Sequence, residues 1–137
     1  MRHGYAPGVT PTRPQELVIP FDELEPTAHS HEFVGAEHGD VPFSVILVHS
    51  DPGVGPKLHR HAYAEVFIVE SGEATFRLGD ETVVVPEGNV VVGPPDVPHG
   101  FVNSGTAELR IVSIHGAPRF GTDWLEGDDP TWRSKQP

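Results

Sequence analysis

Three histidines and one glutamate of this chain stand out by their chemistry and spacing. His59 and His61 are two residues apart, so on a β-strand both side chains point to one face. Glu65 follows closely, and His99 lies further along the chain. Because the sequence has nine histidines and no cysteine, a metal site here must use imidazole nitrogen and carboxylate oxygen, which suit divalent transition ions. The four residues either form such a site or are unrelated polar residues.

The other histidines give weaker signals. His29 and His31 repeat the two-residue spacing, but Gly35 stands where a matching glutamate would be, so we predict that this pair is exposed to solvent. His49 and His115 each close an apolar run. Each is either a hydrogen-bond partner of a metal-binding imidazole or an ordinary strand-end histidine near the surface.

Short apolar runs separated by turn residues make up most of the chain. With 15 glycines and 15 prolines, the composition disfavours long helices and favours short strands joined by turns. We predict strands over residues 17–21, 43–49, 57–61, 65–69, 73–78, 82–85, 90–92, 99–102 and 108–115. The helical candidate is a single turn near residues 122–125. This spacing of strands and turns is typical of an all-β sandwich or barrel.

Two sequence motifs around the candidate ligands resemble those of the cupin family. Residues 53–72, GVGPKLHRHAYAEVFIVESG, resemble the first cupin motif and keep its fixed positions at Gly53, His59, His61, Glu65 and Gly72. Residues 88–103, GNVVVGPPDVPHGFVN, resemble the second motif and keep Gly88, Pro94, His99 and Asn103. Asp96 stands where the family has glycine, and Asp is among the few residues that tolerate the positive φ of a tight turn.

The resemblance implies an all-β, jelly-roll β-barrel of the cupin type. It also implies that one divalent transition-metal ion per chain is held inside the barrel by His59, His61, Glu65 and His99. With four protein ligands, an ion that prefers six keeps two places for water or substrate. The identity of the ion stays open among Fe, Mn, Ni, Cu and Zn, because ligand sets of this type accept several metals.

Further side chains are candidates for contact with a bound substrate. Phe67 and Phe101 share strand parity with the candidate ligands, so we expect both to wall the pocket. Lys57 also shares this parity and either holds an acidic substrate group or is a solvated lysine at the start of a strand. Tyr63 lies in a loop at the barrel mouth, where it contacts a substrate or caps the edge. Trp124 is expected to pack the C-terminal tail on the barrel wall.

Charge and length define the wider context. The chain has nine basic and 20 acidic residues and a net charge of −11, which argues against nucleic acid and anionic membranes as partners. No stretch resembles a signal peptide or a membrane span, so we expect a cytoplasmic protein. We predict a mobile N-terminal arm over residues 1–16, one barrel domain over residues 17–126 and a mobile tail over residues 127–137. A homodimer is expected, in which the arm reaches across.

Two classes of function fit these expectations, and both have a small molecule as partner. The first is an oxygen-dependent, dioxygenase-like oxidoreductase or a metal-assisted isomerase, acting on a small acidic or enolisable compound, with Glu65 as a base. Such a compound is favoured because a positively charged metal centre prefers anionic oxygen ligands. The second is a non-catalytic module that binds or senses a small molecule together with a metal. A fold alone does not decide between them.

Overall fold

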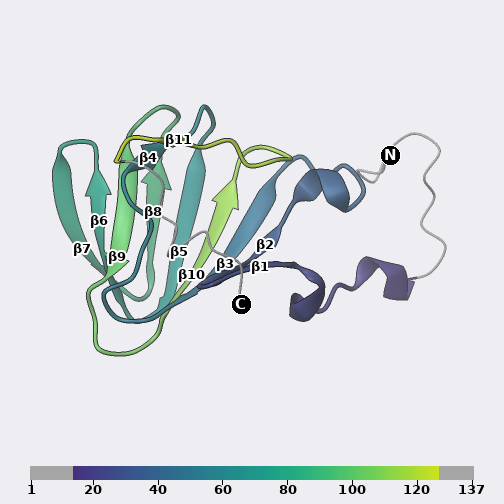
Figure 1. The fold of residues 1–137 in the computed structure, drawn as a ribbon, viewed down its shortest axis with the longest axis horizontal. Coiled ribbons are helices and arrows are strands. Elements are labelled where there is room, and N and C mark those ends of the chain that lie inside the picture. The colour runs from purple at the N-terminus through teal and green to yellow at the C-terminus, as the bar shows by residue number, and fades with distance from the viewer. Residues whose placement is uncertain (1–13, 127–137) are drawn as a thin grey trace.

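Two antiparallel β-sheets face each other in the computed structural model, which describes residues 14–126 (Figure 1). The six-stranded sheet has the order β1 (Glu25–Thr27), β2 (Ser30–Phe33), β3 (Ser44–Ser50), β10 (Leu109–His115), β5 (Glu65–Ser71) and β8 (Asn89–Gly93). The five-stranded sheet has the order β11 (Asp123–Trp124), β4 (His59–Arg60), β9 (His99–Asn103), β6 (Glu73–Leu78) and β7 (Glu81–Pro86). The predicted all-β jelly-roll fold is confirmed.

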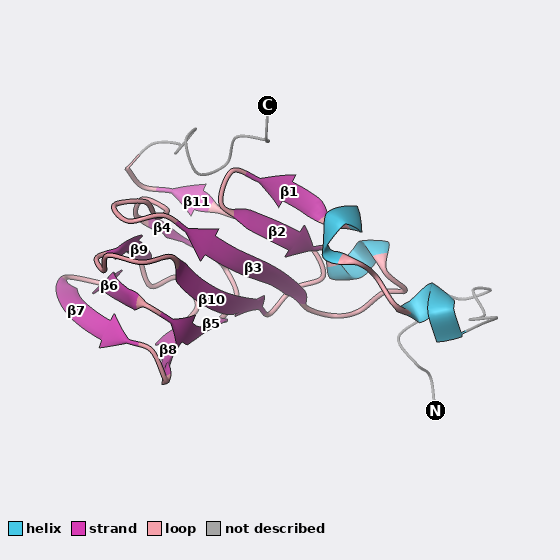
Figure 2. Cartoon of the chain, turned by 90° about the horizontal axis from the view of Figure 1, so that it is seen from below, coloured by secondary structure: helices cyan, strands magenta, loops and turns pink. Residues whose placement is uncertain are grey.

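In the part of the chain that the structure describes, helical structure is restricted to three short 3₁₀ helices. They are η1 (Pro14–Leu17), η2 (Phe21–Glu23) and η3 (Gly35–Glu37). All three lie toward one end of the molecule, beyond β2 and β3 (Figure 2). Among residues 14–126, no helix is long and apolar enough to cross a membrane.

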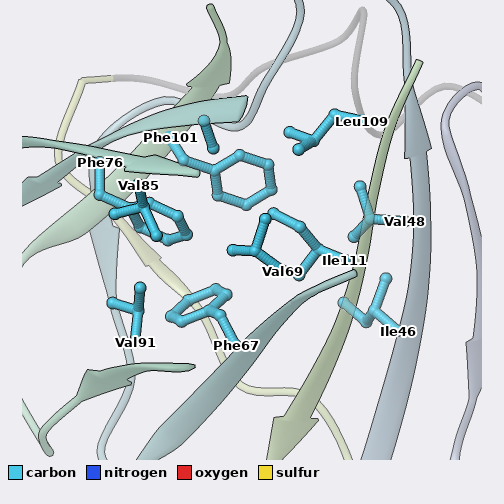
Figure 3. Close-up of a cluster of buried hydrophobic side chains, with 11 residues drawn as sticks. Ile46, Val48, Phe67, Val69, Phe76, Val85, Val91, Phe101, Leu109 and Ile111 are labelled. Atoms are coloured by element: carbon cyan, nitrogen blue, oxygen red, sulfur yellow. The ribbon is translucent and has the colours of Figure 1, made fainter. Parts of the chain in front are cut away.

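Alternating burial along the strands builds an apolar core between the two sheets. β3, β5 and β10 bury every second residue over most of their length, as expected for strands with one face in the core. The core consists of branched and aromatic side chains from both sheets (Figure 3): Ile46, Val48, Phe67, Val69, Ala74, Phe76, Val85, Val91, Phe101, Leu109 and Ile111. Burial of this apolar surface stabilises the barrel independently of any ion.

The predicted strands between residues 43 and 115 are confirmed, with ends that shift by one or two residues. The predicted strand over residues 17–21 is wrong. Leu17 ends η1, Phe21 begins η2, and Pro20 between them has no N–H to donate to a strand neighbour. No strand of the described residues pairs with this segment, and Leu17 and Phe21 are 53% and 62% exposed.

Two strands before β3 were not predicted because their buried residues are polar. β1 and β2 form a hairpin in which Thr27 pairs with Ser30. Thr27, Ser30 and Glu32 are the residues that this hairpin buries, so the apolar alternation that marks most strands is missing. The hairpin extends the six-stranded sheet beside β3.

The segment near the C-terminus also differs from the prediction. The predicted helical turn near residues 122–125 is wrong, since Asp123 and Trp124 form β11 and pair with Arg60 and His59 of β4. Residues 1–13 of the predicted arm and the whole predicted tail, 127–137, lie outside the described residues. The remainder of the arm belongs to η1.

Candidate metal centre

Strands of both sheets bring the four candidate ligands to one point. β4 carries His59, His61 follows it directly, β5 begins at Glu65 and β9 begins at His99. His59 and His99 are direct cross-strand partners. All four side chains are buried, and one ligand atom from each lies within 4.8 Å of those of the other three. The convergence predicted from the sequence is therefore present.

The carboxylate of Glu65 faces two of the imidazoles. Its Oε1 lies 3.1 Å from Nε2 of His61 and 3.1 Å from Nε2 of His99. Neighbouring ligand atoms of an octahedral ion with bonds of ~2.1 Å are about 3.0 Å apart. The observed separations are close to this value, so the cluster is compatible with a single metal ion.

Main-chain hydrogen bonds direct the free nitrogens of two imidazoles toward that point. Nδ1 of His59 donates to the carbonyl of Lys57 at 2.6 Å, and Nδ1 of His61 donates to the carbonyl of Gly121 at 2.7 Å. With the proton on Nδ1, each ring keeps a lone pair on Nε2, as a metal ligand must. Nε2 of His61 is fully buried and makes no hydrogen bond within the described residues. A metal ion would satisfy this atom.

The ionisation states of the site also suit a metal. Burial lowers the pKa of His59 from its usual 6.5 to about 4, because loss of solvation penalises the charged ring. Burial alone would raise the pKa of Glu65, but the imidazoles of His115, His61 and His99 beside its carboxylate hold that pKa well below its usual range. At neutral pH, His59 is neutral and Glu65 is ionised, which are the states that bind cations.

The turn before β9 is hydrogen-bonded to the segment that carries the ligand His61. Asp96, which replaces the glycine of the family motif, has a φ of 63°. Its N–H donates to the carbonyl of His61 at 2.7 Å. The expectation that Asp supports this turn is confirmed, and the turn helps to hold the segment that carries His61.

An inner cavity of about 30 Å³ lies beside the ligands. Its apolar walls are Ile46, Val48, Phe67, Phe101, Phe120 and Trp124. A space of this size holds about one or two water molecules. A wider groove of about 760 Å³ lies outside it, and His61, Phe120 and Thr122 line both spaces. These three residues therefore separate the inner cavity from the groove.

The four predicted substrate-contact residues do not all lie in the same space. Phe67 and Phe101 line the inner cavity. Tyr63 lines the outer groove and stacks on the ring of His61, with 4.8 Å between centroids. The side chain of Lys57 is exposed and lines neither space, and only its carbonyl contacts the site.

Of the four other histidines considered in the sequence analysis, His115 belongs to the site and His29, His31 and His49 do not. His115 is 2% exposed and lines the inner cavity, so the alternative of a surface position does not hold. His49 lies outside the site, with its Nε2 3.3 Å from Nδ1 of His31. His29 and His31 are half-buried where we predicted solvent exposure, because the unexpected hairpin pairs with β3.

The segment that follows β10 contributes to the site in a way that the sequence did not reveal. Trp124 lines the inner cavity, and its ring lies 4.7 Å from that of His59. Phe120 forms another wall, and Gly121 supplies the carbonyl that accepts from His61. The aromatic residues after the last predicted strand were the available signal, but we assigned Trp124 to packing of the tail.

Comparison with known proteins places this architecture in a family. The family model for the cupin domain matches residues 46–115, from within β3 to the end of β10. This chain belongs to the cupin domain family. The matched residues include all four candidate ligands of the cupin, and the resemblance seen in its two motifs is confirmed.

Similar proteins support the cupin fold more than any single activity. H2HPP isomerase of Bacillus subtilis is 28% identical over 101 residues, which are 73% of this cupin and 42% of the isomerase. The cupin thus spans less than half of that protein. A double-stranded β-helix protein of Klebsiella pneumoniae matches 80% of this cupin and 97% of its own chain, with a TM-score of 0.65 and 22% identity. An oxalate oxidase structure matches 80% of this cupin and 64% of its own chain, with a TM-score of 0.67 and 20% identity.

The pKa of His59 predicts a pH dependence of folding for the metal-free cupin. Between about pH 6.5 and about pH 4 the unfolded chain carries a proton on His59 that the folded chain does not, so stability falls as pH falls. Burial lowers the pKa of His115 too, which acts in the same direction. For His59 alone, linkage gives a loss of about 2 kcal/mol between about pH 7.5 and about pH 5. Urea unfolding of chelator-treated protein measures this loss.

The His59→Gln variant is the control for this pH dependence, because glutamine does not titrate. Its unfolding free energy should vary less with pH than that of the wild type, by about 2 kcal/mol over the same range. Equal pH dependence of the two proteins would contradict the assignment of a neutral, buried His59.

Proposed function

We propose that this cupin is a metal-dependent enzyme, an oxygen-dependent, dioxygenase-like oxidoreductase that acts on a small acidic or enolisable compound. The observation that carries the proposal is the convergence of four buried ligand side chains beside a cavity that His59, His61 and Glu65 help to line. A divalent transition ion on His59, His61, Glu65 and His99 supplies a Lewis acid for an anionic substrate oxygen and, when redox-active, electron transfer to dioxygen.

The surrounding side chains define what the protein itself contributes. Glu65 carries the carboxylate that lines the inner cavity, so it is the candidate base for an enolisable carbon once it loosens from the ion. Phe67 and Phe101 limit access of water to the reacting atoms. Tyr63 is placed to contact a substrate in the outer groove. Contact between Lys57 and an acidic substrate group stays a prediction without a supporting contact.

The volumes constrain how a substrate binds. The inner cavity of about 30 Å³ accepts a ligand of the size of water or dioxygen, whereas the groove of about 760 Å³ accepts a larger molecule. A substrate therefore binds with most of its atoms in the groove and its reacting oxygen atoms next to the ligands. Movement of Phe120 or Thr122, which line both spaces, would admit more of it.

A metal-assisted isomerase is the second candidate, and a specific observation favours it. H2HPP isomerase matches 73% of this chain at 28% identity. The same ligand set serves this reaction, since a divalent ion that polarises a substrate carbonyl makes the adjacent carbon more acidic. Glu65 would then move the proton, and dioxygen would not be consumed.

The test combines metal content with turnover. The protein is purified without chelators, its metals are measured by elemental analysis, and oxygen uptake is followed with a panel of enols, phenols and small 2-oxo acids. Uptake that depends on the metal supports the oxidoreductase. Anaerobic change of substrate absorbance without uptake supports the isomerase instead. Tight ligand binding without either reaction would overturn the proposed enzyme and favour a binding or sensing module.

The outer face of the six-stranded sheet offers a surface for a second copy of the chain. Two rows of side chains cross five strands on this face, and they are almost entirely apolar. One row is Val90, Ile68, Val112, Leu47 and His31, and the other is Val92, Val66, Ile114, Val45 and Phe33. The five strands hold 30 residues, and a spacing of ~4.8 Å between strands and ~3.3 Å between residues gives a face of roughly 475 Å² in projection. This is of the order needed for the ~800 Å² of accessible surface that stable dimers bury per partner.

We infer that this face forms a homodimer, and its disruption is testable. Val112→Asp places a charge at the centre of the face, so it should convert the dimer to a monomer in light scattering with multi-angle detection. Val102→Asp is the matched control, because Val102 is equally half-buried on the outer face of the opposite sheet. A wild-type monomer, or a dimer that survives Val112→Asp, would contradict the inference.

A further inference from the structure

The two oxygens of Glu65 have different surroundings. Oε1 faces His61 and His99, each through Nε2 at 3.1 Å. Oε2 faces away from that pair and lies 2.9 Å from Nε2 of His115. Glu65 and His115 are direct cross-strand partners between β5 and β10, so the backbone register fixes this contact. One oxygen therefore lies among the ligand imidazoles, while the other lies next to His115.

His115 does not itself belong to the ligand cluster. The group of side chains whose ligand atoms all lie within 4.8 Å of one another contains His59, His61, Glu65 and His99, but not His115. Nε2 of His115 makes no hydrogen bond within the described residues, and Oε2 of Glu65 lies 2.9 Å from it. Its side chain is 3% exposed, so solvent does not replace that partner.

Tyr63 determines which nitrogen of His115 carries the proton. The hydroxyl of Tyr63 accepts from the N–H of Gly121 at 3.3 Å and lies 2.9 Å from Nδ1 of His115. This pair of contacts is satisfied when the hydroxyl donates its own proton to Nδ1. Nδ1 is then an acceptor, and the ring proton lies on Nε2, where it faces the carboxylate of Glu65.

Packing keeps the side chains of Tyr63, His115 and Glu65 in place. The ring of Tyr63 stacks on His61, and Phe120 contacts His115 edge to face at 4.7 Å between centroids. The N–H of Gly116 donates to the carbonyl of Ala64 at 2.9 Å, which ties together the residues next to His115 and Glu65. The arrangement is more specific than space filling requires, because an apolar side chain at position 115 would leave Oε2 buried without a partner.

We propose that His115 and Tyr63 are positioning residues that hold Glu65 as a one-oxygen ligand. His115 donates to Oε2, Tyr63 orients His115, and Oε1 is thereby directed at the metal ion. The proposal rests on the metal site of the proposed function, but not on its reaction. It assigns a task to two residues outside the ligand set.

The test uses cobalt(II) as a probe, because its visible absorption reports the number and geometry of its ligands. Metal affinity is measured by competition with a chelator for the wild type, His115→Phe and Tyr63→Phe.

Loss of a hydrogen-bond partner of a ligand lowers metal affinity by about 10–100-fold. We expect that loss for His115→Phe together with a changed cobalt spectrum. Tyr63→Phe, which removes one hydroxyl, should give the same spectral change with a smaller loss of affinity. Both variants should still bind one ion per chain.

His49→Phe is the matched control, since His49 is the last residue but one of β3 and lies outside the site. It should leave the cobalt affinity and spectrum at wild-type values. Unfolding curves of the metal-free variants identify any that fail to fold, and Tyr63→Phe keeps the test decisive if His115→Phe is such a case.

Three results would overturn the proposal. Wild-type affinity and spectrum in both variants would show that neither residue positions Glu65. Complete loss of cobalt from a folded His115→Phe would make His115 a ligand. A wild-type chain that binds no cobalt would overturn this proposal and the proposed function together. Absence of turnover in a wild type that binds cobalt, by contrast, would count against the proposed function alone.

Discussion

Replacing His61 by alanine is expected to remove bound metal from the protein while the barrel remains folded. His61 supplies one of four ligand atoms, and its buried Nε2 makes no other hydrogen bond within the described residues. Loss of an outer hydrogen-bond partner lowers metal affinity by about 10–100-fold, so loss of a ligand should lower it by more than about 100-fold. Elemental analysis of protein purified without chelators should fall from about one ion per chain to a small fraction.

His31→Ala is the control for this substitution, because it removes a histidine from the outer sheet face and touches no ligand. It should keep the wild-type metal content. His99→Ala should behave like His61→Ala. If both ligand variants keep the wild-type metal content, the metal site is wrongly assigned, and these histidines are ordinary core residues.

Phe67→Ala should produce the largest loss of folding stability among single substitutions in the core. Phe67 is 1% exposed and contacts Phe76 and Phe101, at 5.1 and 6.0 Å between ring centroids. Removal of a buried phenyl ring costs about 3–5 kcal/mol, because apolar burial is lost and a cavity remains. Urea unfolding of metal-free protein measures this change without a contribution from the ion.

Phe21→Ala provides the comparison, since Phe21 is 62% exposed in η2. Its effect should stay within about 0.5 kcal/mol. A loss below about 1 kcal/mol for Phe67→Ala would mean that the neighbouring rings move to fill the space. In that case the inner cavity would not be rigid, and its size would not select substrates.

The ligand set could be predicted from sequence because local geometry carries most of the information. His59 and His61 share a strand face, and Glu65 and His99 each begin a strand, so short-range parity directs their side chains inward. Strand parity alone does not show that His99 lies beside the other three ligands. The resemblance of the two flanking motifs to those of the cupin family indicated this long-range contact. Apolar alternation likewise predicted the strands from β3 to β10.

The missed features depend on contacts between segments that are distant in sequence. Trp124 reaches His59 because β11 pairs with β4, and two residues are too few to show a strand pattern. The carbonyl of Gly121 that accepts from His61 has no side-chain signature at all. His115 remained ambiguous because the end of an apolar strand can lie at the surface or inside, and only the register with β5 decides.

Two of the ligand imidazoles are held by main-chain carbonyls, and this has an evolutionary consequence. A carbonyl is present whatever side chain its residue carries, so substitutions at positions 57 and 121 do not delete these hydrogen bonds. A Cβ atom at Gly121 would meet nothing within 4 Å. The adjacent Phe120 and Thr122 form the wall between cavity and groove through their side chains. Substitutions at Phe120 or Thr122 would therefore alter the wall but leave these two carbonyl hydrogen bonds in place, and selection should act most strongly against insertions and deletions in this loop.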